Sequence, residues 1–322
     1  MQRNYVNGMK KVIFALLMLV CPVAISAQES RTAYNFLRLP VSAHAAALGG
    51  ENITIIEDDP SLMFSNPALL QSVSSRTISL NYMNYMDGAN TASASYNWTV
   101  KEKATVAVSG QFIDYGKMKE TTADNVQTGE FSAKDIAVCG YLGYDLAQRL
   151  AGGITVKFIT SYIGKYNSIA MGVDLGLNYY DPEREWSVSA VAKNLGGQLK
   201  AFDDDFERMP FDLRLGVSKR LQGAPFRLSA TLTDLTHWDY RFINHVSAGI
   251  DVMLSDAIWI GAGYNFRRAD EMKIQSGDSE SAHGAGLSLG GGIQLDRFKL
   301  NVAYGKFHVS SSSIVINAAY TL

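Results

Sequence analysis

Hydrophobic and polar residues alternate with a period of two along most of the chain after residue 76. From Ile169 to Tyr179, for example, every second residue is large and apolar, and its neighbours are small or polar. A similar ladder runs from Ile314 to Leu322. A period of two is typical of strands whose two faces meet different surroundings, and no long 3.6-residue period competes with it. The sequence therefore predicts an all-β fold.

Breaks at turn-forming residues divide this region into fourteen strands, many of them ten or more residues long. That length suits a tilted membrane-crossing strand and exceeds the usual globular strand. The even number predicts both chain ends on the same side. The strands are expected near residues 76–86, 90–100, 103–114, 130–146, 150–163, 167–180, 184–195, 210–221, 225–235, 242–253, 256–267, 283–295, 298–308 and 312–322.

The connections between these strands alternate in length. Every second connection is tight, as at Lys101-Glu102 and Asp296-Arg297, whereas the others include long polar loops near 115–129, 196–209 and 268–282. Short turns on one side and long loops on the other are typical of outer-membrane barrels. A soluble β-sandwich would also show alternation, but it gives no reason for connection length to sort by side. We therefore predict a 14-stranded antiparallel transmembrane β-barrel, closed because an open edge in lipid leaves backbone groups unpaired.

The polar face of the strands is expected to line the lumen, and the apolar face to meet the lipid of a Gram-negative outer membrane. Charges of both signs on the polar face can pair with each other or with a segment inside the barrel. They are Lys157, Asp174, Lys193, Asp212, Arg214, Arg227, Asp251 and Lys299. Aromatic residues near strand ends, including Trp186, Trp238, Tyr240 and Trp259, suit the girdles of membrane barrels, although ordinary strand preference explains part of them.

Residues 28–75 lack the alternation and carry turn formers instead. Because fourteen strands enclose a lumen too wide for side chains alone to fill, we predict that this segment plugs the barrel formed by residues 76–322. Its aspartates would cap turns or pin the plug to luminal Lys or Arg, or take part in gating. Its apolar residues Phe36, Leu37, Leu39, Met63 and Phe64 would line a pocket or simply pack the plug. The plug motif consists of Asp58, Asp59, Pro60, Asn66, Pro67 and Ala68.

Residues 1–27 read as an export signal for the Sec pathway. Lys10 and Lys11 precede an apolar run that ends in small residues, with cleavage expected after Ala27. A lipoprotein site at Cys21 is less favoured because a valine precedes it. Removal of the signal leaves Cys139 as a single thiol, so no intramolecular disulfide is expected.

Composition narrows the function further. Hydrophobic residues make up 47% of the chain, charged residues 19%, and the net charge is -2. This balance excludes a disordered chain and a protein that binds nucleic acid by charge.

Motifs for catalysis or metal binding are weak. Gly286 to Gly290 matches G-x-S-x-G, but no helix follows to make the nucleophile turn. The five histidines lack metal-ligand spacing. The run Asp203 to Asp205 with Glu207 could bind a hard cation, but it lacks the spacing of a calcium loop and suits a solvated loop better. We therefore expect no enzyme, no cofactor and no metal; an outer-membrane hydrolase with a Ser–His pair is the remote alternative.

The plug region carries a resemblance to known proteins. Tyr34 to Gly50, followed by Asp58-Asp59-Pro60-Ser61 and Asn66-Pro67-Ala68-Leu69-Leu70, is similar to the PorV/PorQ family of Bacteroidetes, and most similar to its PorQ branch. More broadly, the arrangement resembles the FadL superfamily of hydrophobic-compound transporters, fourteen-stranded barrels with an N-terminal hatch that contains an Asn-Pro-Ala element.

The narrower resemblance implies a non-enzymatic accessory barrel of the type IX secretion system. It would anchor a cell-surface attachment complex, with PorZ, PorU and PorV as partners and the long loops as the working surface. The broader resemblance implies an alternative, a passive channel that takes up small hydrophobic molecules and binds such a ligand in its lumen.

Overall fold

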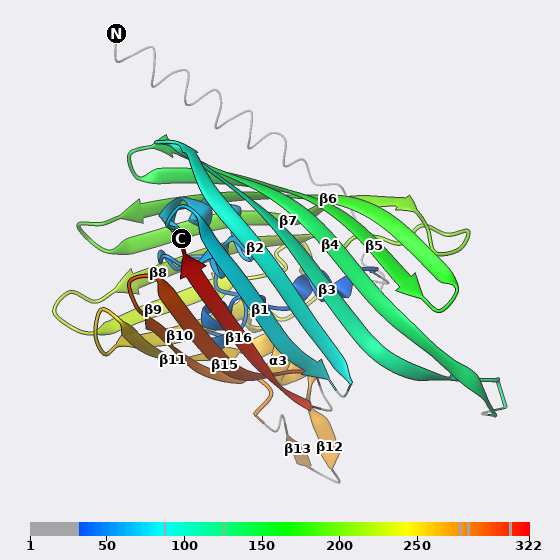
Figure 1. The fold of residues 1–322 in the computed structure, drawn as a ribbon. Coiled ribbons are helices and arrows are strands. Elements are labelled where there is room, and N and C mark those ends of the chain that lie inside the picture. The colour runs from blue at the N-terminus through cyan, green and yellow to red at the C-terminus, as the bar shows by residue number, and fades with distance from the viewer. Residues whose placement is uncertain (1–31, 87, 125, 277–278, 282–283, 309–310) are drawn as a thin grey trace. The chain divides into compact units, whose positions relative to one another are not determined.

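The computed structural model describes residues 32–322, with gaps at 87, 125, 277–278, 282–283 and 309–310. The predicted export signal lies outside the described residues. Fourteen antiparallel strands form a closed barrel in which each strand pairs with its neighbours in the chain, and β1 closes the ring against β16 (Figure 1). The predicted fold class is therefore confirmed. No helix in the described part of the chain is long and apolar enough to cross a membrane.

The observed strands match the predicted ones closely, except at some strand ends on the side of the barrel that carries the long connections. The barrel strands are β1 (Thr77–Met86), β2 (Ala89–Lys101), β3 (Ala104–Thr121), β4 (Gln127–Ala147), β5 (Leu150–Ile163), β6 (Tyr166–Asp181), β7 (Trp186–Lys200), β8 (Asp212–Arg220), β9 (Phe226–Leu232), β10 (Val246–Met253), β11 (Ile258–Asn265), β14 (Leu287–Gln294), β15 (Phe298–His308) and β16 (Ser311–Thr321).

All the long connections lie at one end of the barrel, although the β1–β2, β5–β6 and β15–β16 connections at that end are also short. The tight turns, from β2–β3 to β14–β15, share one end with the start of β1 and the end of β16; we call it the short-turn end. The opposite, long-connection end carries η4 (Phe242–His245), α3 (Phe266–Glu271) and a separate hairpin of β12 (Ile274–Ser276) with β13 (Ser279–Ser281). The predicted loop at 115–129 is wrong, because β3 and β4 continue as a paired ribbon through most of it.

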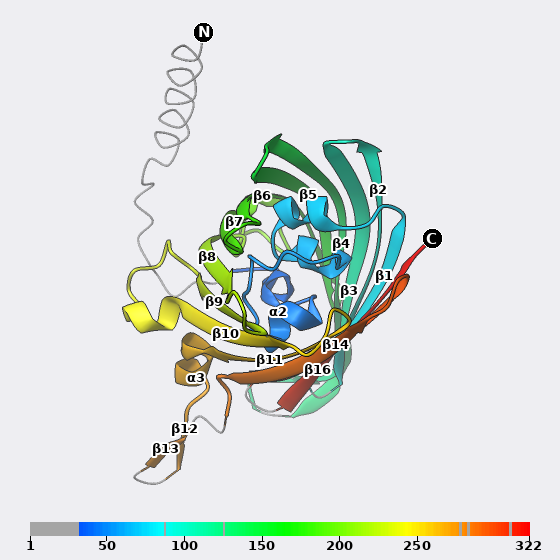
Figure 2. The same ribbon diagram turned by 90° about the vertical axis from the view of Figure 1, so that its left-hand side faces the viewer.

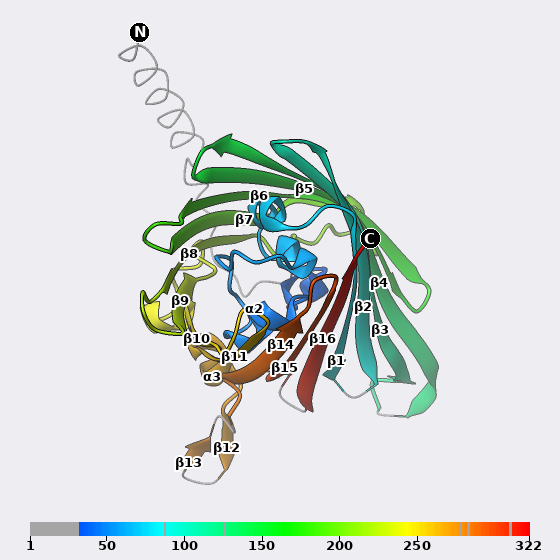
Figure 3. The ribbon, with the colours of Figure 1, turned by 60° about the vertical axis from the view of Figure 1, so that its left-hand side comes forward.

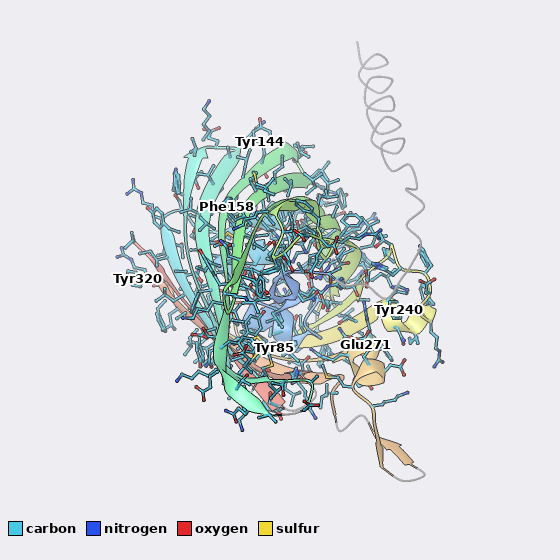
Figure 4. All side chains as sticks on the ribbon, turned by 90° about the vertical axis from the view of Figure 1, so that its right-hand side faces the viewer. Tyr85, Tyr144, Phe158, Tyr240, Glu271 and Tyr320 are labelled. Atoms are coloured by element: carbon cyan, nitrogen blue, oxygen red, sulfur yellow. The ribbon has the colours of Figure 1, made fainter. Side chains whose placement is uncertain are left out.

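Burial alternates along the strands as the sequence period predicts. Outward residues such as Leu80, Phe158 and Tyr320 are 59%, 47% and 46% exposed and form the apolar outer face (Figure 4). Their inward neighbours are small or polar; Ser79, Lys157 and Ala319 are buried. A wall that is apolar outside and polar inside matches a barrel that stands in lipid.

Residues 32–75, which we call the luminal segment, lie within the ring of strands (Figures 2 and 3). The segment contains η1 (Asn35–Arg38), α2 (Ala43–Ala47), η2 (Pro60–Phe64) and η3 (Pro67–Ser72). Side chains cap three of these helices: Ser42 accepts from Ala45 N, Asp59 from Ser61 N, and Asn66 from Ala68 N. Proline occupies the first turn of η2 and η3, where its missing N–H costs nothing.

The luminal segment runs lengthwise through the barrel. Thr32 bridges to Arg208 in the β7–β8 connection, at the long-connection end. At the other end of the segment, Gln71 donates to the carbonyl of Lys103 in a tight turn. The first and last strands do begin and end on the same side, because Thr77 pairs with Thr321 at the short-turn end. The described chain, however, begins at the opposite end, where Thr32 pairs with Arg208.

Candidate functional site

The Asn-Pro-Ala turn of the luminal segment presses directly on the barrel wall. Asn66 Nδ2 donates to the carbonyl of Leu177 on β6 at 3.4 Å and to the carbonyl of Ile53 at 3.1 Å. Gly153 on β5 and Gly176 on β6 face the turn, and a Cβ atom on either would overlap its backbone or the Asn66 side chain. These two glycines let the turn approach the wall, as glycine does wherever a backbone must come close.

The paired aspartates fix the segment by different means. Asp58 Oδ2 lies 2.5 Å from Lys299 Nζ on β15, and the same carboxylate accepts from Ser74 N and Oγ at 2.6 Å. Asp59 forms no ion pair among the described residues; it caps η2 and accepts from Asn301 Nδ2 at 3.1 Å. The first aspartate therefore makes an ion pair with the wall, whereas the second accepts hydrogen bonds from uncharged donors.

A buried cluster of four charged groups joins α2 to β9 and β10. His44 lies between Glu57 (Nδ1 to Oε2, 2.8 Å) and Asp251 (Nε2 to Oδ1, 2.9 Å). Arg227 bridges the same two carboxylates, with 2.7 Å from Nε to Asp251 and 2.7 Å from Nη2 to Glu57. The His44 ring stacks on Trp259 with centroids 3.5 Å apart. With His44 protonated the cluster is neutral, which is how buried charges are tolerated.

The carboxylates control the charge of His44. Burial alone would lower the pKa of His44, but the nearby Glu57 and Asp251 outweigh it and raise that pKa from 6.5 to about 9. Burial likewise opposes the charge of Glu57, yet His44 and Arg227 lower the pKa of Glu57 from 4.5 to about 2. The cluster is therefore fully charged near neutral pH.

The raised pKa of His44 predicts that the barrel becomes less stable at alkaline pH. Because the pKa of His44 is raised on folding, its contribution is complete below pH 6.5 and is lost as the pH rises through about 9. We expect the free energy of unfolding in detergent to fall by about 3 kcal/mol across that interval. In His44→Gln the same titration should leave stability nearly flat between pH 6.5 and 9. Equal slopes in both proteins would contradict the assignment.

A second buried cluster lies on β5 to β8. Lys157 Nζ is 2.8 Å from Asp174 Oδ2, and Arg214 joins Asp212 (2.6 Å) to Glu51 of the luminal segment (2.5 Å). A β-bulge, in which Lys193 and Asn194 face Asp174, turns both side chains into the lumen. Lys193 Nζ then donates to the carbonyl of Phe64 at 2.9 Å. The ion pairs of Lys157 and Arg214 and the hydrogen bond of Lys193 therefore surround the middle of the segment.

Two cavities lie beside the luminal segment. One, of about 30 Å³, is bounded by apolar residues of the segment and by the second charged cluster; its lining includes Leu37, Leu39, Pro40, Val41, Phe64 and Tyr141. The other, of about 220 Å³, opens at the short-turn end and is more polar, with Glu57, Arg220 and Arg227 in its lining. The lumen is therefore largely filled in this conformation.

All eight charged residues assigned to the lumen are buried inside the barrel. Four of them, Lys193, Arg214, Arg227 and Lys299, contact the luminal segment at Phe64, Glu51, Glu57 and Asp58. Asp212 and Asp251 pair with two of these cations, whereas Lys157 and Asp174 pair with each other on the wall. Sequence reasoning missed His44, Glu51 and Glu57. It also placed Trp259 in a lipid-facing girdle, which is wrong: its side chain is buried against His44, and its neighbours Ile258 and Ile260 face outward.

The G-x-S-x-G stretch is part of the wall. Ser288 lies on β14, where its hydroxyl accepts from Gly49 N at 3.0 Å and donates to the carbonyl of Ala47 at 3.1 Å. Its role in the structure is to hold the end of α2. The acidic residues Asp203 to Asp205 and Glu207 are exposed in the β7–β8 connection, and no group of three or more potential ligands in the described residues is arranged to hold a metal.

Similar proteins were found by structure only. No protein-family model matches the chain, and no curated protein sequence does. The toluene transporter TodX of Pseudomonas putida is similar, with a TM-score of 0.57 and 13% identity over 87% of this chain and 97% of that one. So are the CymD monoaromatic hydrocarbon channel (0.57, 15%, 89% and 98%) and a FadL homologue of Pseudomonas aeruginosa (0.53, 11%, 87% and 98%). At these identities the likeness establishes a shared fold, that of FadL-type outer-membrane barrels.

Proposed function

We propose that this chain is an outer-membrane channel for small hydrophobic molecules in which the luminal segment acts as the plug. The fold is shared with channels whose names assign them toluene and monoaromatic hydrocarbons. The observation that carries the proposal is the set of apolar side chains that the plug contributes to one face of the smaller cavity, opposite the charged residues of the wall: Leu37, Leu39, Pro40, Val41 and Phe64. Contact with such side chains removes apolar surface of a hydrophobic solute from water, which favours its binding, whereas a polar solute gains no such free energy.

The plug is attached in a way that permits movement. Besides apolar packing, the polar contacts that hold it are side-chain hydrogen bonds and ion pairs, together with one isolated bridge at Thr32. A cavity of about 30 Å³ is far below the roughly 300–1,000 Å³ of ordinary ligand pockets. Passage of a solute therefore requires the segment around Leu37 and Phe64 to shift, and the charged clusters are the contacts that resist this shift.

The filled lumen also favours a second candidate, the accessory barrel of type IX secretion. A scaffold needs a rigid barrel and no open path, and residues 34–50, which carry the resemblance to the PorV/PorQ family, pack tightly inside it. The long-connection end would then bind PorZ, PorU or PorV. The clusters at Asp251 and Lys299 would lock the plug permanently rather than gate it.

One deletion strain separates the two candidates. We expect loss of the gene to reduce the uptake of radiolabelled toluene, and the wild-type gene to restore it, while PorZ stays on the cell surface. Unchanged toluene uptake would refute the channel. Loss of PorZ from the surface, with uptake intact, would establish the scaffold instead, and pull-down from detergent with mass spectrometry would identify its partners.

A further inference from the structure

The strands on one side of the barrel are short, so the wall spans less of the barrel axis there; we call this the low side. Strands β8 to β11 and β14 contain 9, 7, 8, 8 and 8 residues, whereas β3 to β6 contain 18, 21, 14 and 16. At about 3.3 Å per residue and a tilt of about 40°, eight residues rise only about 20 Å, less than the apolar band of about 25 Å. On this side the strands alone do not cover the hydrocarbon layer.

The connection between β9 and β10 supplies apolar surface at that point. Its residues 238–243, which we call the aromatic patch, expose Trp238 (66%), Tyr240 (39%), Phe242 (63%) and Ile243 (39%). The patch, which includes the start of η4, lies on the outer flank of the ring of strands rather than over the lumen (Figures 2 and 4). The patch therefore continues the outward apolar face of β9 and β10, where Leu228 and Ile250 are exposed.

The aromatic patch is fixed in place from behind. The Arg267 guanidinium of α3 lies 4.4 Å from the Tyr240 ring centre, donates to its hydroxyl at 3.2 Å and pairs with buried Asp234. Asn244 Nδ2 of η4 donates to Asp270 at 2.9 Å. These contacts hold the connection in one conformation, so its apolar side chains stay exposed and do not fold back onto the barrel.

We propose that the aromatic patch inserts into the outer leaflet and anchors the low side of the barrel, with Arg241 at the level of anionic lipid phosphates. Amphipathic rings such as those of Trp and Tyr settle at the headgroup level, and Arg pairs strongly with phosphate. The neighbouring β7–β8 connection offers a contrast: Phe206 is 67% exposed, but Asp203 to Asp205 and Glu207 flank it in the sequence. That acidic run is repelled by the same phosphates and stays in water. In the aromatic patch the single exposed carboxylate, Asp239, is offset by Arg241.

The test uses these two aromatic positions as a matched pair. In a Cys139→Ser background, an environment-sensitive dye is attached at Phe242→Cys, at Ile243→Cys or at Phe206→Cys, and the barrel is reconstituted in phosphatidylcholine vesicles containing phosphatidylglycerol. Lipids spin-labelled at set depths should quench the dye at 242 and 243, about 5–10 Å inside the headgroup boundary. The dye at 206 should respond only to aqueous iodide. Heat-modifiable migration on gels verifies that each variant is folded.

Two results would overturn the proposal. If iodide quenches the dyes at 242 and 243 as strongly as the dye at 206, the patch faces water and is free for a protein partner. The headgroup contact fails separately if Arg241→Gln leaves the depth at 243 unchanged in vesicles with phosphatidylglycerol; we expect a shallower position, equal to that in pure phosphatidylcholine. Neither outcome depends on what the lumen carries.

Discussion

Replacing Arg227 by leucine is expected to lower the free energy of unfolding by about 3–5 kcal/mol, the usual cost of removing one partner from a buried ion pair. Arg227 bridges Glu57 and Asp251, and the latter is completely buried. Without the guanidinium, His44 alone faces two carboxylates, and the cluster carries a net negative charge inside the barrel. Urea unfolding in detergent, followed by far-ultraviolet circular dichroism, measures the change.

Two further variants show whether charge is the cause. Arg220→Leu removes an exposed arginine at the end of the neighbouring β8 and should change stability by less than about 0.5 kcal/mol. The double variant Arg227→Leu/Glu57→Gln restores neutrality around His44 and Asp251, so it should recover much of the loss. If the double variant is no more stable than Arg227→Leu, lost packing rather than unbalanced charge explains the effect.

Gly176→Val is expected to unseat the plug. Its Cβ would overlap Asn66 Oδ1 and lie 2.9 Å from Pro67 Cδ, so the Asn-Pro-Ala turn has to leave the wall. Strain of about 1–3 kcal/mol in the seated state raises the population of the unseated state by roughly 5–150-fold. We expect the ion conductance of single barrels in planar bilayers to rise accordingly, since an unseated segment opens an aqueous path.

Gly140→Val is the matched control for this experiment. Gly140 lies on β4, two strands away from β6, faces outward, and a Cβ there meets no atom within 4 Å. Its conductance should equal that of the wild type. If Gly176→Val folds and conducts no better than Gly140→Val, the turn at Asn66 does not close the lumen.

The sequence predicts the strands well because a period of two reports directly that lipid lies on one face and polar groups on the other. The same reason explains why residues 115–129 are wrongly predicted as a loop although most of them are paired strands. The ribbon of β3 and β4 extends beyond the barrel wall, and there both faces meet water. Its residues Lys117, Lys119 and Thr128 are all exposed, so no alternation marks the strands.

The candidate site is predictable only in part. Strand parity assigns charges such as Arg227 and Lys299 to the interior, because their neighbours are apolar. It cannot assign their partners, since these depend on how a segment without periodicity folds inside the ring. His44 lies in an alanine-rich stretch that gives no sign of a cluster, whereas Trp259 could have been placed in the lumen from its position between Ile258 and Ile260.

The lengthwise course of the luminal segment constrains assembly. Thr32 lies at one mouth of the barrel and Gln71 at the other, so the chain traverses the whole pore before its first strand begins. A ring that had already closed would have to be threaded from end to end, past every inward side chain. We therefore expect the strands to assemble around the leading segment, so that the ring closes with this peptide already inside it.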